Sequence, residues 1–116
     1  MSNSTTQPPD LSVARTIARQ IGPFAFRCMG TTTHVGGLNN LTFDVKGAKR
    51  INKIRITLEP MNAYTVQFLF VGKGGLEVKY VATDSEVYVD KLHETIEMRT
   101  GLFLRLTSPP IKEITD

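Results

Sequence analysis

Hydrophobic and polar residues alternate in five segments of this chain, and alternation predicts β-strands because successive strand side chains point to opposite faces. The segments are Phe24–Met29, Leu41–Lys46, Ile51–Glu59, Tyr64–Val71 and Leu76–Thr83. Short, turn-rich linkers join the last four, which favours an antiparallel meander, since a parallel crossover needs a dozen or more residues. Only the linker from Gly30 to Asn40 is long enough to form a flexible loop.

Two further segments have helical periodicity. The first begins at the N-cap residue Asp10 and ends before Gly22, and the second runs from about Ser85 to Thr100 and ends at Gly101. Each has one apolar stripe, so we place both helices on the same face of the sheet. The pattern therefore predicts an α+β domain with a five-stranded antiparallel sheet and an N-terminal and a C-terminal helix on one face.

The other face of this sheet is expected to be polar and open to solvent. By alternation it would carry Arg27, Thr42, Lys46, Lys53, Arg55, Thr57, Gln67 and Lys79. Leu69 and Val71 break this polarity, because alternation puts them on the same open face. They indicate either partial cover of this face by the Gly30–Asn40 loop or an exposed apolar patch for a protein partner.

Charge is distributed unevenly along the chain. The net charge is +3, but residues 1–55 contain eight Lys or Arg against two Asp, whereas residues 56–116 contain six against nine Asp or Glu. The densest cationic group surrounds one predicted turn and comprises Lys46, Lys49, Arg50, Lys53 and Arg55. Such a group is suited to contact with phosphates, so it is the predicted nucleic-acid site. Alternation puts the nearby aromatic residues on the core face, which predicts backbone contacts rather than base stacking.

The remaining candidate chemistry is sparse. His34 lies in the Gly30–Asn40 loop without a second His or Cys nearby, so we expect no metal site, and the single Cys28 is expected to be a small buried residue. The sequence Gly72-Lys73-Gly74-Gly75 lacks the spacing of a phosphate-binding loop. No nucleophile–base pattern is present, so we expect a protein without catalytic activity or cofactor.

Length and composition favour one cytoplasmic domain. At 116 residues the chain has the size of a single domain, and it begins without the basic and apolar regions of a secretory signal. No apolar run approaches the length of a membrane span. We expect residues 1–9 to be a disordered lead-in, residues 10–106 to form the domain, and residues 107–116 to be a flexible tail.

Six short blocks of the sequence carry a resemblance: Phe26–Thr31, Leu41–Phe43, Asn52–Leu58, Ala63–Phe68, Val87–Leu92 and Thr100–Phe103. In these blocks the chain resembles a family of small uncharacterised proteins encoded by bacteriophages and other mobile elements. The resemblance implies an accessory role in a bacterial host and transfers no catalytic or ligand residue. It leaves two alternatives open. One is nucleic-acid binding through the cationic group, and the other is inhibition of a host defence complex through His34, Leu69 and Val71, a sheet edge or the acidic second helix.

Overall fold

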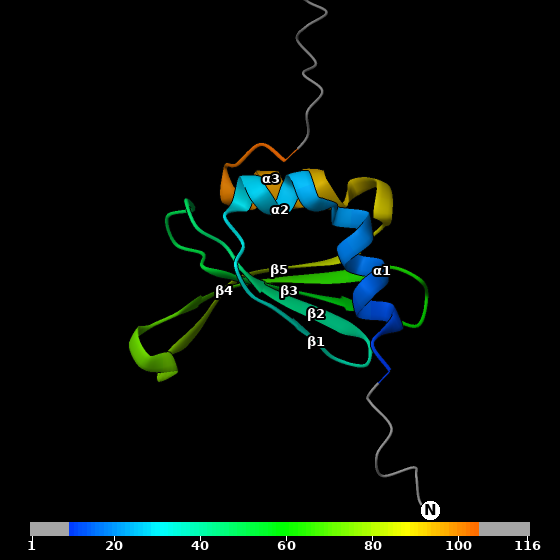
Figure 1. Cartoon of the computed structure of the whole chain (residues 1–116), viewed down its shortest axis with the longest axis horizontal. Helices are drawn as coiled ribbons and strands as arrows, with labels where there is room; N and C mark the ends of the chain where they lie inside the picture. The colour runs from blue at the N-terminus through cyan, green and yellow to red at the C-terminus, as the bar shows by residue number, and fades with distance from the viewer. Residues whose placement is uncertain (1–9, 105–116) are drawn as a thin grey trace, which may run out of the picture.

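The computed structural model describes residues 10–104 of the chain (Figure 1). Its elements are α1 (Ser12–Ile21), α2 (Pro23–Met29), β1 (His34–Gly36), β2 (Asn40–Asp44), β3 (Lys53–Leu58), β4 (Tyr64–Val71), η2 (Lys73–Gly75), β5 (Val78–Val87), η3 (Val89–Lys91) and α3 (Leu92–Thr100). The strands lie in sequence order and every neighbouring pair is antiparallel. The predicted α+β class and meander are confirmed. The predicted lead-in and tail lie outside the described residues.

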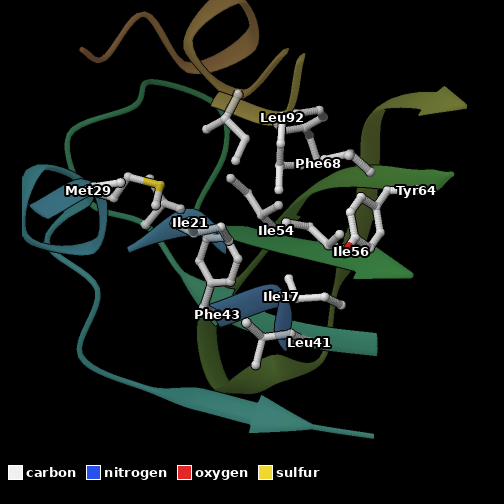
Figure 2. Close-up of a cluster of buried hydrophobic side chains, with 14 of the residues drawn as sticks. Ile17, Ile21, Met29, Leu41, Phe43, Ile54, Ile56, Tyr64, Phe68 and Leu92 are labelled. Atoms are coloured by element: carbon white, nitrogen blue, oxygen red, sulfur yellow. The ribbon is translucent and has the colours of Figure 1, made fainter. Parts of the chain in front are cut away.

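All three α-helices lie on one side of the sheet, and the core fills the space between the two layers (Figure 1). From α1 the buried residues are Ala14, Ile17 and Ile21, which are three and four residues apart and so share one helical face. From β3, Ile54 and Ile56 point toward the same layer (Figure 2). None of the helices in residues 10–104 is long and apolar enough to cross a membrane.

The segment predicted as the first strand is instead the helix α2. Pro23 begins the helix, where its missing N–H costs nothing, and Gly30 ends it in the left-handed conformation. Within the helix, Ala25 and Met29 are buried four residues apart. The alternation prediction was wrong here because this short apolar run satisfies helical spacing equally well. Cys28 is therefore a partly buried helix residue rather than a strand residue.

The first strand of the sheet, β1, lies in the segment that the sequence predicted to be a flexible loop. Val35 pairs with Thr42, and Gly36 pairs with Leu41. Gly36 lies close against α1, since a Cβ at this position would come within 2.8 Å of the Ala14 Cβ atom. A side chain larger than glycine would collide with the helix, so the close approach of α1 requires this residue.

The C-terminal helix begins seven residues later than the sequence predicted, at Leu92 instead of Ser85. Residues 84–87 belong to β5, where Val66 pairs with Asp84 and Tyr64 with Val87. The carboxylate of Asp84 does not cap a helix; it accepts two hydrogen bonds from Arg99 of α3, at 2.8 and 2.9 Å. Pairing with β4 thus overrides the local helix-start signal.

Two β-bulges in β5 change which side chains face the helices. Phe68 pairs with Ala82, but Leu69 pairs with Tyr80, so Val81 is an extra residue in β5. A second irregularity lies between Val66 and Tyr64, where Glu86 has a positive φ of 54°. In the residues of β5 before Val81 the alternation is reversed, so Tyr80 faces the side of the sheet that carries Leu69.

Candidate nucleic-acid interface

The helix-free side of the sheet, here called the open face, carries cationic side chains from β3. Lys53 pairs with Asp44 on one side and Leu69 on the other, and Arg55 pairs with Thr42 and Gln67. Residues paired across an antiparallel sheet share a face, and Ile54 and Ile56 occupy the opposite, buried face. Lys53 and Arg55 therefore lie on the open face, as predicted from the alternation. The Nε atom of Arg55 donates a hydrogen bond of 3.3 Å to the Thr42 hydroxyl.

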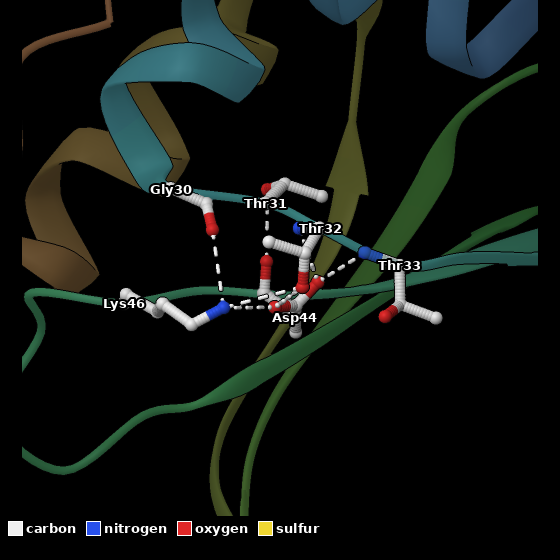
Figure 3. A network of polar contacts seen from close by, with 6 residues as sticks. All are labelled: Gly30, Thr31, Thr32, Thr33, Asp44 and Lys46. Carbon is white, nitrogen blue, oxygen red and sulfur yellow. Dashed lines mark hydrogen bonds and ion pairs between the residues drawn. The ribbon is translucent and has the colours of Figure 1, made fainter.

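Lys46, the third predicted contact, is engaged within the protein (Figure 3). Its Nζ atom lies 2.9 Å from the Asp44 carboxylate and also donates to the Thr32 hydroxyl at 3.2 Å and the Gly30 carbonyl at 3.4 Å. Asp44 further accepts hydrogen bonds from the amides of Thr32 and Thr33, at 2.9 and 2.7 Å. This network fastens the segment after α2 to the end of β2.

The same network determines the charge state of Asp44. Burial alone would raise the pKa of its carboxyl group, but the hydrogen bonds from Lys46, Thr33 and Thr32 outweigh this effect and hold the pKa well below its ordinary value. Asp44 is consequently ionised at neutral pH, and its charge is balanced by Lys46. Asp44 and Lys53 are paired in the sheet, but the Asp44 carboxylate binds Lys46, Thr32 and Thr33 instead. Lys53 is therefore available to contact a ligand.

Lys49 and Arg50 lie in the connection between β2 and β3 and are exposed. Asn52 holds the end of this connection in place, because its side-chain amide donates to the Val71 carbonyl at 2.9 Å and accepts from the Val71 N–H at 2.8 Å. These two hydrogen bonds extend the pairing of β3 with β4, but through the Asn52 side chain instead of backbone groups. No ion pair involves Lys49, Arg50, Lys53 or Arg55 among residues 10–104.

Tyr80 adds an aromatic ring to the open face, which the sequence did not predict. Lys53, Leu69 and Tyr80 are paired in a row across β3, β4 and β5, and Tyr80 is 56% exposed. Uninterrupted alternation had put Tyr80 in the core; the bulge at Val81 reverses its direction. No local signal in the sequence marks this bulge, since it is defined by the pairing with β4.

The residues predicted for a protein partner do not form one patch. His34 begins β1, and its ring lies 4.5 Å from that of Phe26 in an edge-on arrangement, whereas Leu69 and Val71 belong to β4, three strands away. Leu69 is only 3% exposed, yet it is not part of the main core cluster. The expectation that Leu69 adds exposed apolar surface was wrong, because this residue, paired with Lys53 and Tyr80, is buried.

The opposite end of the open face is acidic. Glu59 follows β3, six residues after Lys53, and its carboxylate accepts a hydrogen bond of 2.8 Å from the Thr65 hydroxyl. Glu59 and Glu86 border a hollow of about 390 Å³ that is also lined by Met61 and Tyr88. The open face therefore changes from positive to negative along β3. Among the described residues no group of three His, Cys, Asp or Glu has the arrangement of a metal site.

No protein-family model, curated protein or solved structure matches this chain. The resemblance to bacteriophage and mobile-element proteins therefore stays a prediction.

Proposed function

We propose that this protein binds single-stranded nucleic acid through the cationic end of its open face, largely without regard to sequence. The observation that carries the proposal is the row Lys53–Leu69–Tyr80, which puts a cation and an exposed aromatic ring on one face. The two residues lie two strands apart, or roughly 10 Å at the ordinary strand spacing. Proteins that bind single strands combine backbone-neutralising cations with rings on which bases stack.

The phosphate contacts in this proposal are Lys49, Arg50, Lys53 and Arg55, all on or beside the start of β3. Asp44 compensates the positive charge of Lys46, so we assign Lys46 a structural role and not a phosphate contact. Glu59 at the far end of β3 would repel phosphates and confine a strand to the cationic end. A single strand is favoured over a duplex because stacking on Tyr80 requires an unpaired base.

The resemblance of the sequence gives this proposal a biological setting. An accessory protein of a phage or mobile element would act in the cytoplasm of its bacterial host, where single-stranded DNA and RNA are both present. The proposed activity is binding without catalysis and needs no cofactor.

Fluorescence anisotropy with labelled oligonucleotides tests the proposal. We expect the protein to bind single strands at low salt more tightly than a duplex of the same length. Tyr80→Ala should weaken binding by about 1–3 kcal/mol, the cost of losing one stacked base. Reversal of Lys49, Arg50 and Lys53 to Glu should abolish binding with little change in melting temperature, because these side chains pack no core.

A matched control reverses charges on the helix side of the molecule. Arg15→Glu and Arg19→Glu change two exposed cations of α1, which lies on the other face of the sheet. This variant should bind nucleic acid nearly as well as the unchanged protein. Absence of binding at low salt, or equal losses in both variants, would refute the proposal.

Binding to a host protein is a second candidate, supported by the exposed apolar residues at the end of the β4–β5 hairpin. Phe70, Leu76 and Val78 are all exposed there. An inhibitor of a host complex would use such a surface as the buried centre of its interface. A pull-down from nuclease-treated host lysate distinguishes the two candidates, because only a protein complex survives the nuclease.

A further inference from the structure

The β4–β5 hairpin extends beyond the rest of the sheet. The last residue pair between β3 and β4 is Lys53–Leu69, whereas β4 and β5 continue to pair through Phe70–Lys79 and Val71–Val78. We call residues 70–80 the arm. Figure 1 shows it leaving the sheet on the side away from the helices. Beyond Leu69 the arm has only two strands among the described residues, with Val71 still held by two hydrogen bonds to the Asn52 side chain.

Apolar side chains of the arm are open to solvent. Leu76 is 91% exposed, Val78 53% and Phe70 40%. A two-stranded ribbon is at best marginally stable in water, and three or more strands with an apolar face are needed for independent stability. Exposed apolar residues on such a ribbon are typical of a surface that is covered in an assembly.

The outer edge of β5 is the free edge of the arm. β5 is the last strand of the sheet, so one side of its backbone has no partner strand among residues 10–104. The Gly72 N–H donates to the Glu77 carbonyl at 2.8 Å, which continues the hairpin pairing beyond Val71 and Val78. Val78–Tyr80 belong to β5 and Glu77 continues its pairing, so residues 77–80, preceded by Leu76, present one free edge that is a ready template for another strand.

The sequence of this segment, Leu-Glu-Val-Lys-Tyr, is complementary to itself. We propose that two copies of the protein form a dimer by antiparallel pairing of residues 76–80 about a two-fold axis at Val78. In this register Leu76 lies opposite Tyr80 of the second copy, and Glu77 lies opposite Lys79. The three apolar residues share one face, and both charge pairs on the other face join opposite signs.

The bulge at Val81 limits the pairing to the arm. An extra residue interrupts the regular spacing of backbone groups, and bulges protect an edge from further pairing. The second irregularity, at Glu86, acts likewise on the rest of β5. The dimer is therefore a four-stranded sheet made of two arms rather than a continuous sheet along the whole of β5.

This inference rests on the free edge and the sequence of the arm and not on the proposed nucleic-acid binding, although Tyr80 takes part in both. Residues paired across an antiparallel edge share a face, so the open faces of both copies would lie on the same side of the joined arms. If the protein also binds nucleic acid, the dimer presents two cationic sites to one strand. The partner proposed for the arm is a second copy, and a host protein bound at Leu76 and Val78 would compete with it for the same surface.

Sedimentation velocity of the full chain, purified free of nucleic acid, tests the dimer and its register. The unchanged protein should shift from monomer to dimer as its concentration rises. Lys79→Glu places Glu opposite Glu in both charge pairs and should raise the dissociation constant of the dimer by about tenfold. The double variant Glu77→Lys, Lys79→Glu exchanges the charges within each pair and should restore the original value.

Lys91→Glu is the matched control, because it makes the same charge change at an exposed residue of η3, outside the arm. It should leave the dissociation constant unchanged, and thermal melting should show that all variants fold. A protein that stays monomeric at every concentration would overturn the proposal. A dimer that Lys79→Glu does not weaken, or that the double variant does not restore, would overturn it too, because its interface would have another register or lie elsewhere.

Discussion

The side chain of Asp44 accepts four hydrogen bonds from three residues. It joins the segment after α2 to β2 through Lys46, Thr32 and Thr33. No feature of the local sequence predicts these contacts, since the Thr residues lie eleven and twelve positions earlier. The consequence is twofold: the carboxylate positions β1 beside β2, and it leaves the neighbouring Lys53 without an internal counter-ion.

The pKa of Asp44 leads to a prediction on pH dependence. Because the folded pKa is lowered, the contribution of Asp44 to stability is present above its unfolded pKa of about 4 and is lost as the pH falls through the folded value. Asp44→Asn should therefore reduce the free energy of unfolding at pH 7 and reduce its loss between pH 5 and pH 2. Urea unfolding across this range measures both effects, and parallel curves for the two proteins would contradict the prediction.

Among the elements, β5 departs furthest from regular geometry. Its two bulges direct Tyr80 to the open face and turn Asp84 toward α3, where Arg99 binds it. A regular strand of the same sequence would direct Tyr80 to the helix side of the sheet. The candidate site and the arm therefore both depend on irregularities in one strand.

The positive φ of Glu86 leads to a prediction on the stability of this element. A residue with a Cβ is strained in this region, so Glu86→Gly should raise the free energy of unfolding by about 0.5–1 kcal/mol, after allowing for the greater freedom of glycine in the unfolded chain. Ser85→Gly is the control: Ser85 has no positive φ, and the change should destabilise by a similar amount. Chemical denaturation of both variants measures the difference, which would vanish if the bulge were not formed in solution.

At the scale of the whole molecule, Lys53 and Glu59 lie at opposite ends of β3 on the open face, and the carboxylate near Lys53, that of Asp44, is compensated by Lys46. Lys53 begins the strand and Glu59 follows its end. The uneven charge of the sequence thus becomes a polarity in space. A polyanion would be steered to one end only.

This polarity predicts the salt dependence of nucleic-acid binding. Each phosphate neutralised on a single strand contributes about −0.7 to the slope of log K against log salt, so four cations give a slope no steeper than about −3. Glu59→Gln should tighten binding at low salt by removing a repulsive charge, with the slope almost unchanged. Anisotropy titrations across a salt series measure both. A slope near zero would rule out phosphate contacts by these residues.

The sequence by itself determined the fold class, because burial of one face of a strand or helix leaves a periodic record along the chain. The strand Tyr64–Val71 matches β4 at both ends, and Ile54 and Ile56 are buried as their alternation with Lys53 and Arg55 requires. The first helix ends at Ile21, before Gly22, as predicted. Each of these features depends on residues close together in the chain.

Only the tertiary structure decided the features that depend on distant partners. Residues 23–29 carry apolar residues at both strand and helix spacing, and the strand β1 exists because β2 and the Asp44 network hold it. Residues 84–87 contain a helix-start signal that pairing with β4 overrides. The direction of Tyr80, and with it the proposed stacking site, depends on a one-residue offset between β4 and β5. Such an offset is a property of the pair of strands, so neither strand encodes it alone.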